Sequence, residues 1–449
     1  MKDLTQGKTS KIILQFALPI FIGSLFNLLY NLTDTRIIGS FLGNDALASV
    51  GSISTVNDLI VGLLVGLANG FSVITAQFYG MGRKDKIKKN FASSVFAGLI
   101  ITIIISAVCL IGLPVLLNIL NIDEFHKGAA AGYISIIFAG LIFTFLYNVL
   151  AATLRAVGDS YTPLIFLVIS VIINVLLDLL FVGALELGVE GTAIATVISQ
   201  IISFISCAIY TWIRHDILRI HLADLKPEKE YLYRILPAGF SMGLMSCLVS
   251  FGTVALQTAI NNLGTNIIVA HAAARKLTNL YMMPHIALST AMATFCGQNY
   301  GANRLDRVRE GLKSVVLMCY VWIFIVQIMT YTICPFLVKA ITDSTITEVI
   351  DTACLYQRVD TLFYAVVVII SVFRNSLQGL GDHKTPIISS TLELIGKIAF
   401  AFIFTPLLGY WAVIWAEPVV WIIMVIPLII SVYKRLYKTS PSTTENENE

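Results

Sequence analysis

Two carboxylates stand inside long apolar stretches of this sequence. Asp34 lies near the end of the stretch Ile12–Ile38, and Asp178 lies in the stretch 161–184. A charge in hydrocarbon is unfavourable without a partner, so an ionisable residue at membrane depth usually belongs to a binding or transport site. The alternative is that Asp34 only caps its helix beside Arg36 and that Asp178 pairs with a cationic side chain elsewhere. The residues alone leave both interpretations open.

Neutral oxygen donors recur near these carboxylates at helical spacing. Asn174 precedes Asp178 by four residues, so the two side chains share one helix face, and Thr196 lies in the next apolar stretch. Hard cations bind several oxygens of carboxylate, amide and hydroxyl groups. Two close carboxylates also resist ionising together, which suits proton binding. The predicted site for sodium or a proton, with no further cofactor, comprises Asp34, Asn174, Asp178 and Thr196.

Side chains suited to a substrate cavity lie in the first, fourth and eighth apolar stretches. Methionine and aromatic side chains adapt to varied apolar ligands. Core packing is the alternative for most of them, and for His285 in particular. Pro19 lies inside the first stretch, where its missing N–H and its ring bend or break a helix, so we expect a hinge there. The predicted cavity residues are Asn27, Tyr30, Asn31, Asn148, Tyr281, Met282, Met283 and His285.

The composition places these residues in a membrane protein. Of the 449 residues, 57% are hydrophobic and 13% are charged, and the mean hydropathy is +0.83. Such a chain has too little polar surface for a soluble globule of its size. The formal net charge of +3 gives no argument for a nucleic-acid partner. The seven cysteines lack metal-binding spacing, and we find no nucleotide-binding loop or nucleophile motif, so we predict neither an enzyme nor an ATP-driven pump.

About twelve apolar runs of spanning length follow one another along the chain. Arg and Lys collect in alternate breaks between the runs and in both tails, whereas the opposite breaks hold only Lys127 and Lys339. The positive-inside rule therefore places both termini in the cytoplasm, in a multi-pass protein of the cytoplasmic membrane whose first span is not cleaved. The predicted spans are 12–38, 48–80, 90–117, 129–156, 161–184, 190–213, 231–261, 266–297, 309–338, 350–379, 385–407 and 410–434.

The second half of the chain weakly repeats the first. Gly158-Asp159 returns as Gly381-Asp382, and Leu18-Pro19 returns as Leu236-Pro237. Each half holds six spans, so both halves insert with the same orientation and relate by a pseudo-twofold axis along the membrane normal. We therefore predict an all-α polytopic membrane protein with twelve transmembrane helices in two six-helix bundles. The predicted parts are an N-terminal lobe 1–213, a cytoplasmic connector 214–230, a C-terminal lobe 231–438 and a disordered cytoplasmic tail 439–449.

The second half lacks the predicted ion site. Counted from the repeated Gly-Asp turns, Lys397 and Ala401 stand where Asn174 and Asp178 stand in the first half. Glu393 precedes Lys397 by four residues, so we predict an ion pair in which the two neutralise each other. A contact of this pair with substrate is the alternative.

Short motifs recur along the whole chain, namely Pro19, Asp34, Leu154–Asp159 followed by Pro163, Asn174 with Asp178, and Gln298–Gly301. Together they resemble the multidrug and toxic compound extrusion (MATE) family, over about residues 8–438. The resemblance implies two six-helix lobes that export cationic, amphipathic compounds in exchange for sodium or protons. It also implies a cation site at the four residues named above and a bend at Pro19 linked to protonation of Asp34. Residues 240–256 hold no acid, and in this the chain looks similar to the DinF-like branch.

We predict a secondary active multidrug exporter that antiports cationic amphipathic drugs or metabolites against sodium or protons by alternating access. The alternative is a flippase for a lipid-linked oligosaccharide or polar lipid, which would need a wider, cationic cavity, and the spans offer few cations beyond Arg275, Lys276 and Lys397. A non-transporting sensor or scaffold is a third class. The expected partners are small amphipathic molecules and the lipid bilayer, with no nucleic acid and a monomeric chain. The sequence leaves open the physiological substrate, the oligomeric state and the roles of Arg358 and Asp360.

Overall fold

The computed structural model describes residues 2–120, 122–221, 224–226, 228–342 and 346–438, and these residues form helices without any β-strand. The tail predicted for 439–449 lies outside the described residues. Apolar runs fold as helices because lipid offers the backbone no hydrogen-bond partner, and a helix satisfies its N–H and C=O groups internally. The prediction of an all-α membrane protein is confirmed.

The first half of the chain forms six long helices joined by short turns and helical segments. Two of its helices end in π-helical turns, at Ile38–Leu42 and Leu179–Ala184, and a 3₁₀ turn spans Asp216–Leu218. The helices are α1 (Thr9–Ile37), α2 (Gly43–Gly80), α3 (Lys84–Ile111), α4 (Leu113–Ile119), α5 (Glu124–Ala156), α6 (Tyr161–Asp178) and α7 (Gly188–Arg214).

The second half repeats this order of long helices, although the counterpart of α5 is broken at Phe363 into two helices and a short helix precedes the last long one. Its π-helical turns lie at Phe400–Phe404 and Lys434–Lys438. The helices are α8 (Lys229–Ile260), α9 (Thr265–Gly301), α10 (Leu305–Thr332), α11 (Cys334–Thr342), α12 (Thr347–Leu362), α13 (Tyr364–Gly379), α14 (Lys384–Ala399), α15 (Thr405–Leu408) and α16 (Tyr410–Tyr433).

The helices agree with the predicted number of membrane spans. By length and hydropathy, nine stretches of the described residues can cross a membrane, and the first of these, Thr9–Gly80, contains both α1 and α2. The pair α12 and α13, bent by 55°, passes the same test as one span. Counting α1 and α2 separately and adding this pair gives eleven. The helix α9 is 37 residues long but is not among the stretches that pass the test, and including it gives twelve.

The chain packs into two compact units, which are described separately here. The N-terminal unit comprises Met1–Asp3 and Leu18–Cys247, and the C-terminal unit comprises Leu4–Ala17 and Leu248–Glu449. The start of α1 therefore belongs to the C-terminal unit, and the first part of α8 belongs to the N-terminal unit. The division within α1 falls just before Pro19, through which α1 continues as one helix.

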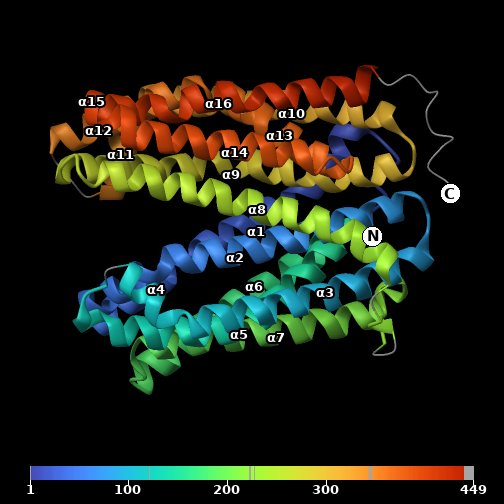
Figure 1. The fold of residues 1–449 in the computed structure, drawn as a ribbon, viewed down its shortest axis with the longest axis horizontal. Helices are drawn as coiled ribbons and strands as arrows, with labels where there is room; N and C mark the ends of the chain where they lie inside the picture. The colour runs from blue at the N-terminus through green and yellow to red at the C-terminus, as the bar shows by residue number, and fades with distance from the viewer. Residues whose placement is uncertain (1, 121, 222–223, 227, 343–345, 439–449) are drawn as a thin grey trace. The chain divides into compact units, whose positions relative to one another are not determined.

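The core of the N-terminal unit forms around α5, which packs between α2 and α7 (Figure 1). The first part of α8 approaches α2 at paired glycines. A β-carbon on Gly66 would lie 2.6 Å from the Cα atom of Gly243, which is far inside van der Waals contact. Because glycine has no side chain, these two backbones can approach closely, as in other small-residue helix contacts in membranes.

In the C-terminal unit, α9 packs against α10, α12 and α13. The last residues of α9 contact the segment that precedes α1. Leu4 is fully buried there. The Arg307 guanidinium donates to the carbonyl oxygens of Gly7 at 2.9 Å and Leu4 at 3.3 Å, and to Asn299 Oδ1 at 3.1 Å. The Gln-Asn-Tyr-Gly sequence that ends α9 thus supplies a docking point for the segment that precedes α1.

The repeated Gly-Asp turns have the same local geometry. Asp159 accepts hydrogen bonds from the Thr162 backbone N–H at 3.0 Å and hydroxyl at 2.7 Å. Asp382 accepts the same pair of bonds from Thr385 at 3.1 and 2.7 Å. A carboxylate before a helix satisfies N–H groups that lack an intrahelical partner, so each aspartate fixes the start of the next helix.

Candidate ion site and a C-terminal charge network

The predicted ion-site residues converge from α1, α6 and α7 within the N-terminal unit. Asp178 and Asn174 are fully buried on α6. When the Asn174 amide nitrogen faces Asp178, it donates to Asp178 Oδ2 at 3.0 Å, and its oxygen accepts from the Thr196 backbone N–H at 3.3 Å. The Tyr30 hydroxyl lies 3.0 Å from Thr196 Oγ1. Asp34 is close enough to Asp178 for the two carboxylates to interact electrostatically, so both belong to one site.

Each carboxylate retains an oxygen that is available to bind an ion. Asp34 Oδ1 and Asp178 Oδ1 are buried and find no hydrogen-bond partner among the described residues. Neither forms an ion pair in that part of the chain, and Arg36 does not pair with Asp34 there. Buried polar atoms are normally satisfied, so two carboxylate oxygens without a partner in one site are typical of a place that binds an ion or a proton. Together with the amide and hydroxyl oxygens, they suit a monovalent cation or a proton.

The helix geometry around Asp178 is irregular. Asp178 is the last residue of α6 before the π-helical turn Leu179–Ala184, and such turns are frequent at functional sites. Tyr133 on α5 interacts electrostatically with both site carboxylates and with Asp58 on α2. Sequence spacing did not indicate Tyr133 or Asp58, because their helices meet the site only after packing.

The predicted cavity residues divide between the two units. In the N-terminal unit, Asn27 and Asn31 are exposed, and the Asn148 amide donates to a carbonyl oxygen of its own helix at 2.8 Å. In the C-terminal unit, Tyr281 and His285 are buried, and the His285 ring hydrogen-bonds a serine on α13 at 3.4 Å. Met282 is also buried, and Met283 is half-buried. The buried members therefore lie in the packed interior of the C-terminal unit, and their part in a substrate cavity stays a prediction.

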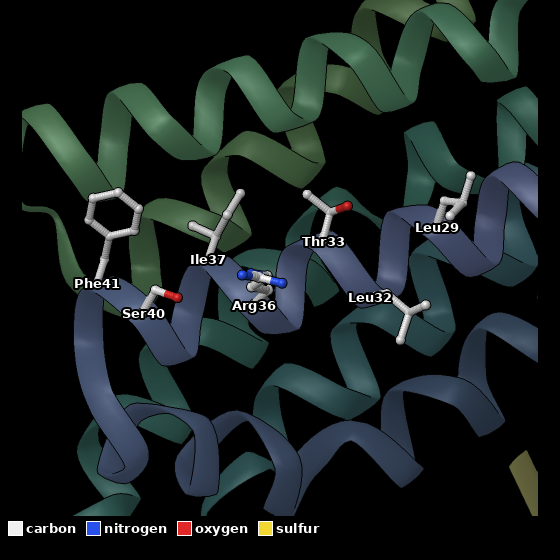
Figure 2. Close-up of a pocket in the computed structure, with 7 residues that line it drawn as sticks. All are labelled: Leu29, Leu32, Thr33, Arg36, Ile37, Ser40 and Phe41. Atoms are coloured by element: carbon white, nitrogen blue, oxygen red, sulfur yellow. The ribbon is translucent and has the colours of Figure 1, made fainter. Parts of the chain in front are cut away.

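A separate cavity of about 390 Å³ follows one face of α1 and the π-helical turn after it (Figure 2). It includes none of the predicted cavity residues. Its wall is apolar apart from one guanidinium and two hydroxyl groups. The lining residues are Leu29, Leu32, Thr33, Arg36, Ile37, Ser40 and Phe41.

A chain of alternating charges crosses the C-terminal unit from α13 to α9. Lys397 Nζ lies 3.0 Å from Glu393 Oε1, so the predicted ion pair forms. Each of the two residues also contacts a further charged side chain. Arg374 lies 3.5 Å from Glu393, and Lys397 also lies 3.4 Å from Glu417. Arg275 contacts both carboxylate oxygens of Glu417, at 3.0 and 3.1 Å. We call these five residues the C-terminal charge network.

Asp360 and Arg358 find different partners. Asp360 is buried, accepts a hydrogen bond from the Tyr364 hydroxyl at 3.0 Å, and interacts electrostatically with the charge network. Its second oxygen has no hydrogen-bond partner among the described residues. The Arg358 guanidinium lies 6.0 Å from the centre of the Tyr331 ring, which is the range of a cation–π interaction.

Comparison with known proteins shows which family this chain belongs to. The sequence model of the MatE family matches residues 19–180 and 241–403, which is more than half of the chain and one segment in each repeat. The chain belongs to the MatE family. This MatE protein is therefore a multi-pass membrane transporter and not an enzyme, and its two matched segments account for the internal repeat.

Relatives and solved structures agree with this assignment. The MatE protein is 31% identical over 310 residues to the probable multidrug resistance protein YpnP of Bacillus subtilis, with 68% of each chain covered. It is 25% identical over 410 residues to the multidrug export protein MepA of Staphylococcus aureus, covering 90% of this chain and 89% of MepA. A solved MATE family transporter in an outward-facing conformation superimposes with a TM-score of 0.89 at 23% identity, with 97% of each chain covered. A second, crystallised in a bent conformation, gives a TM-score of 0.89 at 23% identity and 96% coverage of each chain.

Proposed function

We propose that this protein is a secondary active exporter of the cytoplasmic membrane, with both termini in the cytoplasm. It moves small amphipathic, often cationic drugs or metabolites outward in exchange for sodium or protons. The observation that carries the proposal is the pair of carboxylates Asp34 and Asp178, each with one buried oxygen that finds no hydrogen-bond partner among the described residues. The names of the relatives, multidrug resistance and multidrug export proteins, support the substrate class. The absence of an acid in 240–256 favours the DinF-like branch.

Ion binding can drive export only if it changes the balance between conformations or the affinity for substrate. One sodium ion or proton would neutralise one of the two negative charges of the Asp34–Asp178 site, and the oxygens of Asn174 and Thr196 would complete its coordination. Asp34 lies on the same helix as Pro19, which adjoins the point where α1 passes from one packing unit to the other. Because proline lacks an N–H, a bend there breaks fewer hydrogen bonds than elsewhere in α1. We infer that neutralising Asp34 shifts the conformation of α1 about Pro19.

The charge network favours the exporter over the flippase. A lipid pyrophosphate would require cations that are free to bind it. Arg275 and Lys397 instead contact Glu417 and Glu393, so their charges are already compensated.

Dye efflux from proteoliposomes that contain the purified protein tests the proposal, with a sodium gradient and a proton gradient imposed separately. Asp34→Asn and Asp178→Asn keep the side-chain size and remove the charge, so we expect gradient-driven efflux to fall to the rate of empty liposomes. Asp45→Asn, an exposed carboxylate early in α2, serves as the matched control and should transport normally. Wild-type efflux by both site variants would refute the assignment of the coupling site.

A further inference from the structure

The internal repeat aligns the ion site with the C-terminal charge network. The Gly-Asp turns place Lys397 at the position of Asn174. A glycine of positive φ precedes or begins both α7 and α16, and counting from these glycines places Glu417 at the position of Thr196. An amide and a hydroxyl in one half are therefore replaced in the other half by an ammonium and a carboxylate.

The alignment extends to the remaining site residues. The Leu-Pro pairs of α1 and α8 place Gly252 at the position of Asp34. A β-carbon on Gly252 would lie 2.9 Å from Lys397 Cδ, so the space of the first carboxylate is taken by the lysine side chain. The matching bounds of α5 and α12–α13 place Tyr356 at the position of Tyr133. Tyr356 interacts electrostatically with Arg275, whereas Tyr133 interacts with the carboxylates of the ion site.

The two sites differ in charge balance. The N-terminal site holds two carboxylates, and no cationic side chain pairs with them among the described residues. The charge network with Asp360 holds three cationic and three acidic side chains, which balance when all are ionised. Within it Lys397 alone contacts two glutamates, at 3.0 and 3.4 Å, in the part of the chain that the structure describes. Its ammonium lies between two carboxylates, as a free cation would.

We propose that the Lys397 ammonium is a tethered cation that occupies the C-terminal counterpart of the ion site. This half of the protein therefore binds no exchangeable coupling ion, and one site per chain is loaded and emptied. A covalently attached cation is not released, and separating it from two buried carboxylates would leave uncompensated charge. The inference rests on the proposed function in one respect, namely that the N-terminal site is the site that exchanges ions.

Ion binding to the purified full-length protein in lipid nanodiscs tests the proposal without any drug substrate. The probes are radioactive sodium at equilibrium and proton uptake after a pH step. The double variant D34N/D178N should lose the exchangeable ion. Adding Lys397→Ala leaves the network one negative charge in excess, so we expect uptake of about one sodium or proton per chain to return. Lys276→Ala in the same background removes an exposed lysine beside Arg275 and should restore nothing.

A second variant keeps the proposal testable if Lys397→Ala does not fold. Asn174→Lys in the otherwise natural chain carries the tethered cation into the N-terminal site, and it should lower ion uptake by about one sodium or proton per chain with both aspartates intact. Ion binding that survives in D34N/D178N would overturn the proposal, because the C-terminal half would then hold an exchangeable ion. A folded triple variant that takes up neither probe would overturn it as well. A protein that exports no dye but gives the expected binding pattern would fail only the proposed function.

Discussion

The substitution Asp159→Asn tests how the turn between α5 and α6 is held. Asp159 Oδ2 lies 3.3 Å from His215 Nε2 at the end of α7, and the two side chains are only 14% and 7% exposed. Burial raises the pKa of Asp159, but the hydrogen bonds from His215 and Thr162 outweigh it and lower the pKa from 3.8 to about 2. Asparagine keeps an oxygen for the Thr162 N–H and removes the carboxylate that accepts the hydrogen bond from His215.

The pKa shift of Asp159 gives the expected loss of stability in Asp159→Asn. Each pKa unit corresponds to about 1.4 kcal/mol of preference for the charged form, so this shift corresponds to about 2 kcal/mol. Asp159→Asn should lower the free energy of unfolding by about that amount at neutral pH. Asp159→Ala also removes the helix cap, which contributes about 1 kcal/mol more.

The pH dependence has a definite sign. The pKa of Asp159 is lower in the folded chain than in the unfolded chain, so its contribution is complete above pH 3.8 and is lost as the pH falls to about 2. The difference in stability between the natural chain and Asp159→Asn should therefore be constant above about pH 5 and vanish over that acidic range.

Thermal unfolding in detergent, followed by size-exclusion chromatography over a pH series, measures this difference. Asp216→Asn is the control, because Asp216 is 85% exposed and its contact with Arg219 should contribute little. Equal unfolding temperatures for Asp159→Asn and the natural chain at pH 7 would refute the reasoning. So would a stability difference that persists unchanged below pH 2.

Three further predictions concern packing. Glu417→Gln leaves the cations beside it without their carboxylate and should destabilise the protein by about 3–5 kcal/mol, as measured by thermal unfolding. An additional Lys397→Met should recover part of the lost stability. Full stability of Glu417→Gln alone would contradict the network. Gly66→Ala forces a methyl group onto the backbone of Gly243 and should lower stability by about 1–3 kcal/mol, with reduced yield of folded protein as a second readout. Arg307→Lys removes the planar group that holds the chain ahead of α1, so protease should cleave there faster; an unchanged rate would show that the other contacts suffice.

The sequence by itself determined the helical architecture. Long apolar runs separated by charged breaks must form spanning helices, since lipid leaves the backbone no other partner. The repeated Gly-Asp and Leu-Pro pairs revealed the duplication, because turns and proline positions depend on local backbone geometry. The sequence also predicted the pairs Asn174 with Asp178 and Glu393 with Lys397, because a spacing of four residues places two side chains on one helix face.

The tertiary structure decided which separate helices complete these local pairs. Glu417 joins Arg275 across 142 residues of sequence, and Tyr30 meets Thr196 across 166, and no local spacing encodes either contact. Burial of Tyr281 and His285 likewise depends on how neighbouring helices pack, not on residue type. Spacing along one helix is a property of its own backbone, whereas a charge between helices finds its partner only when the chain folds, since the partner is whichever opposite charge packing brings within reach.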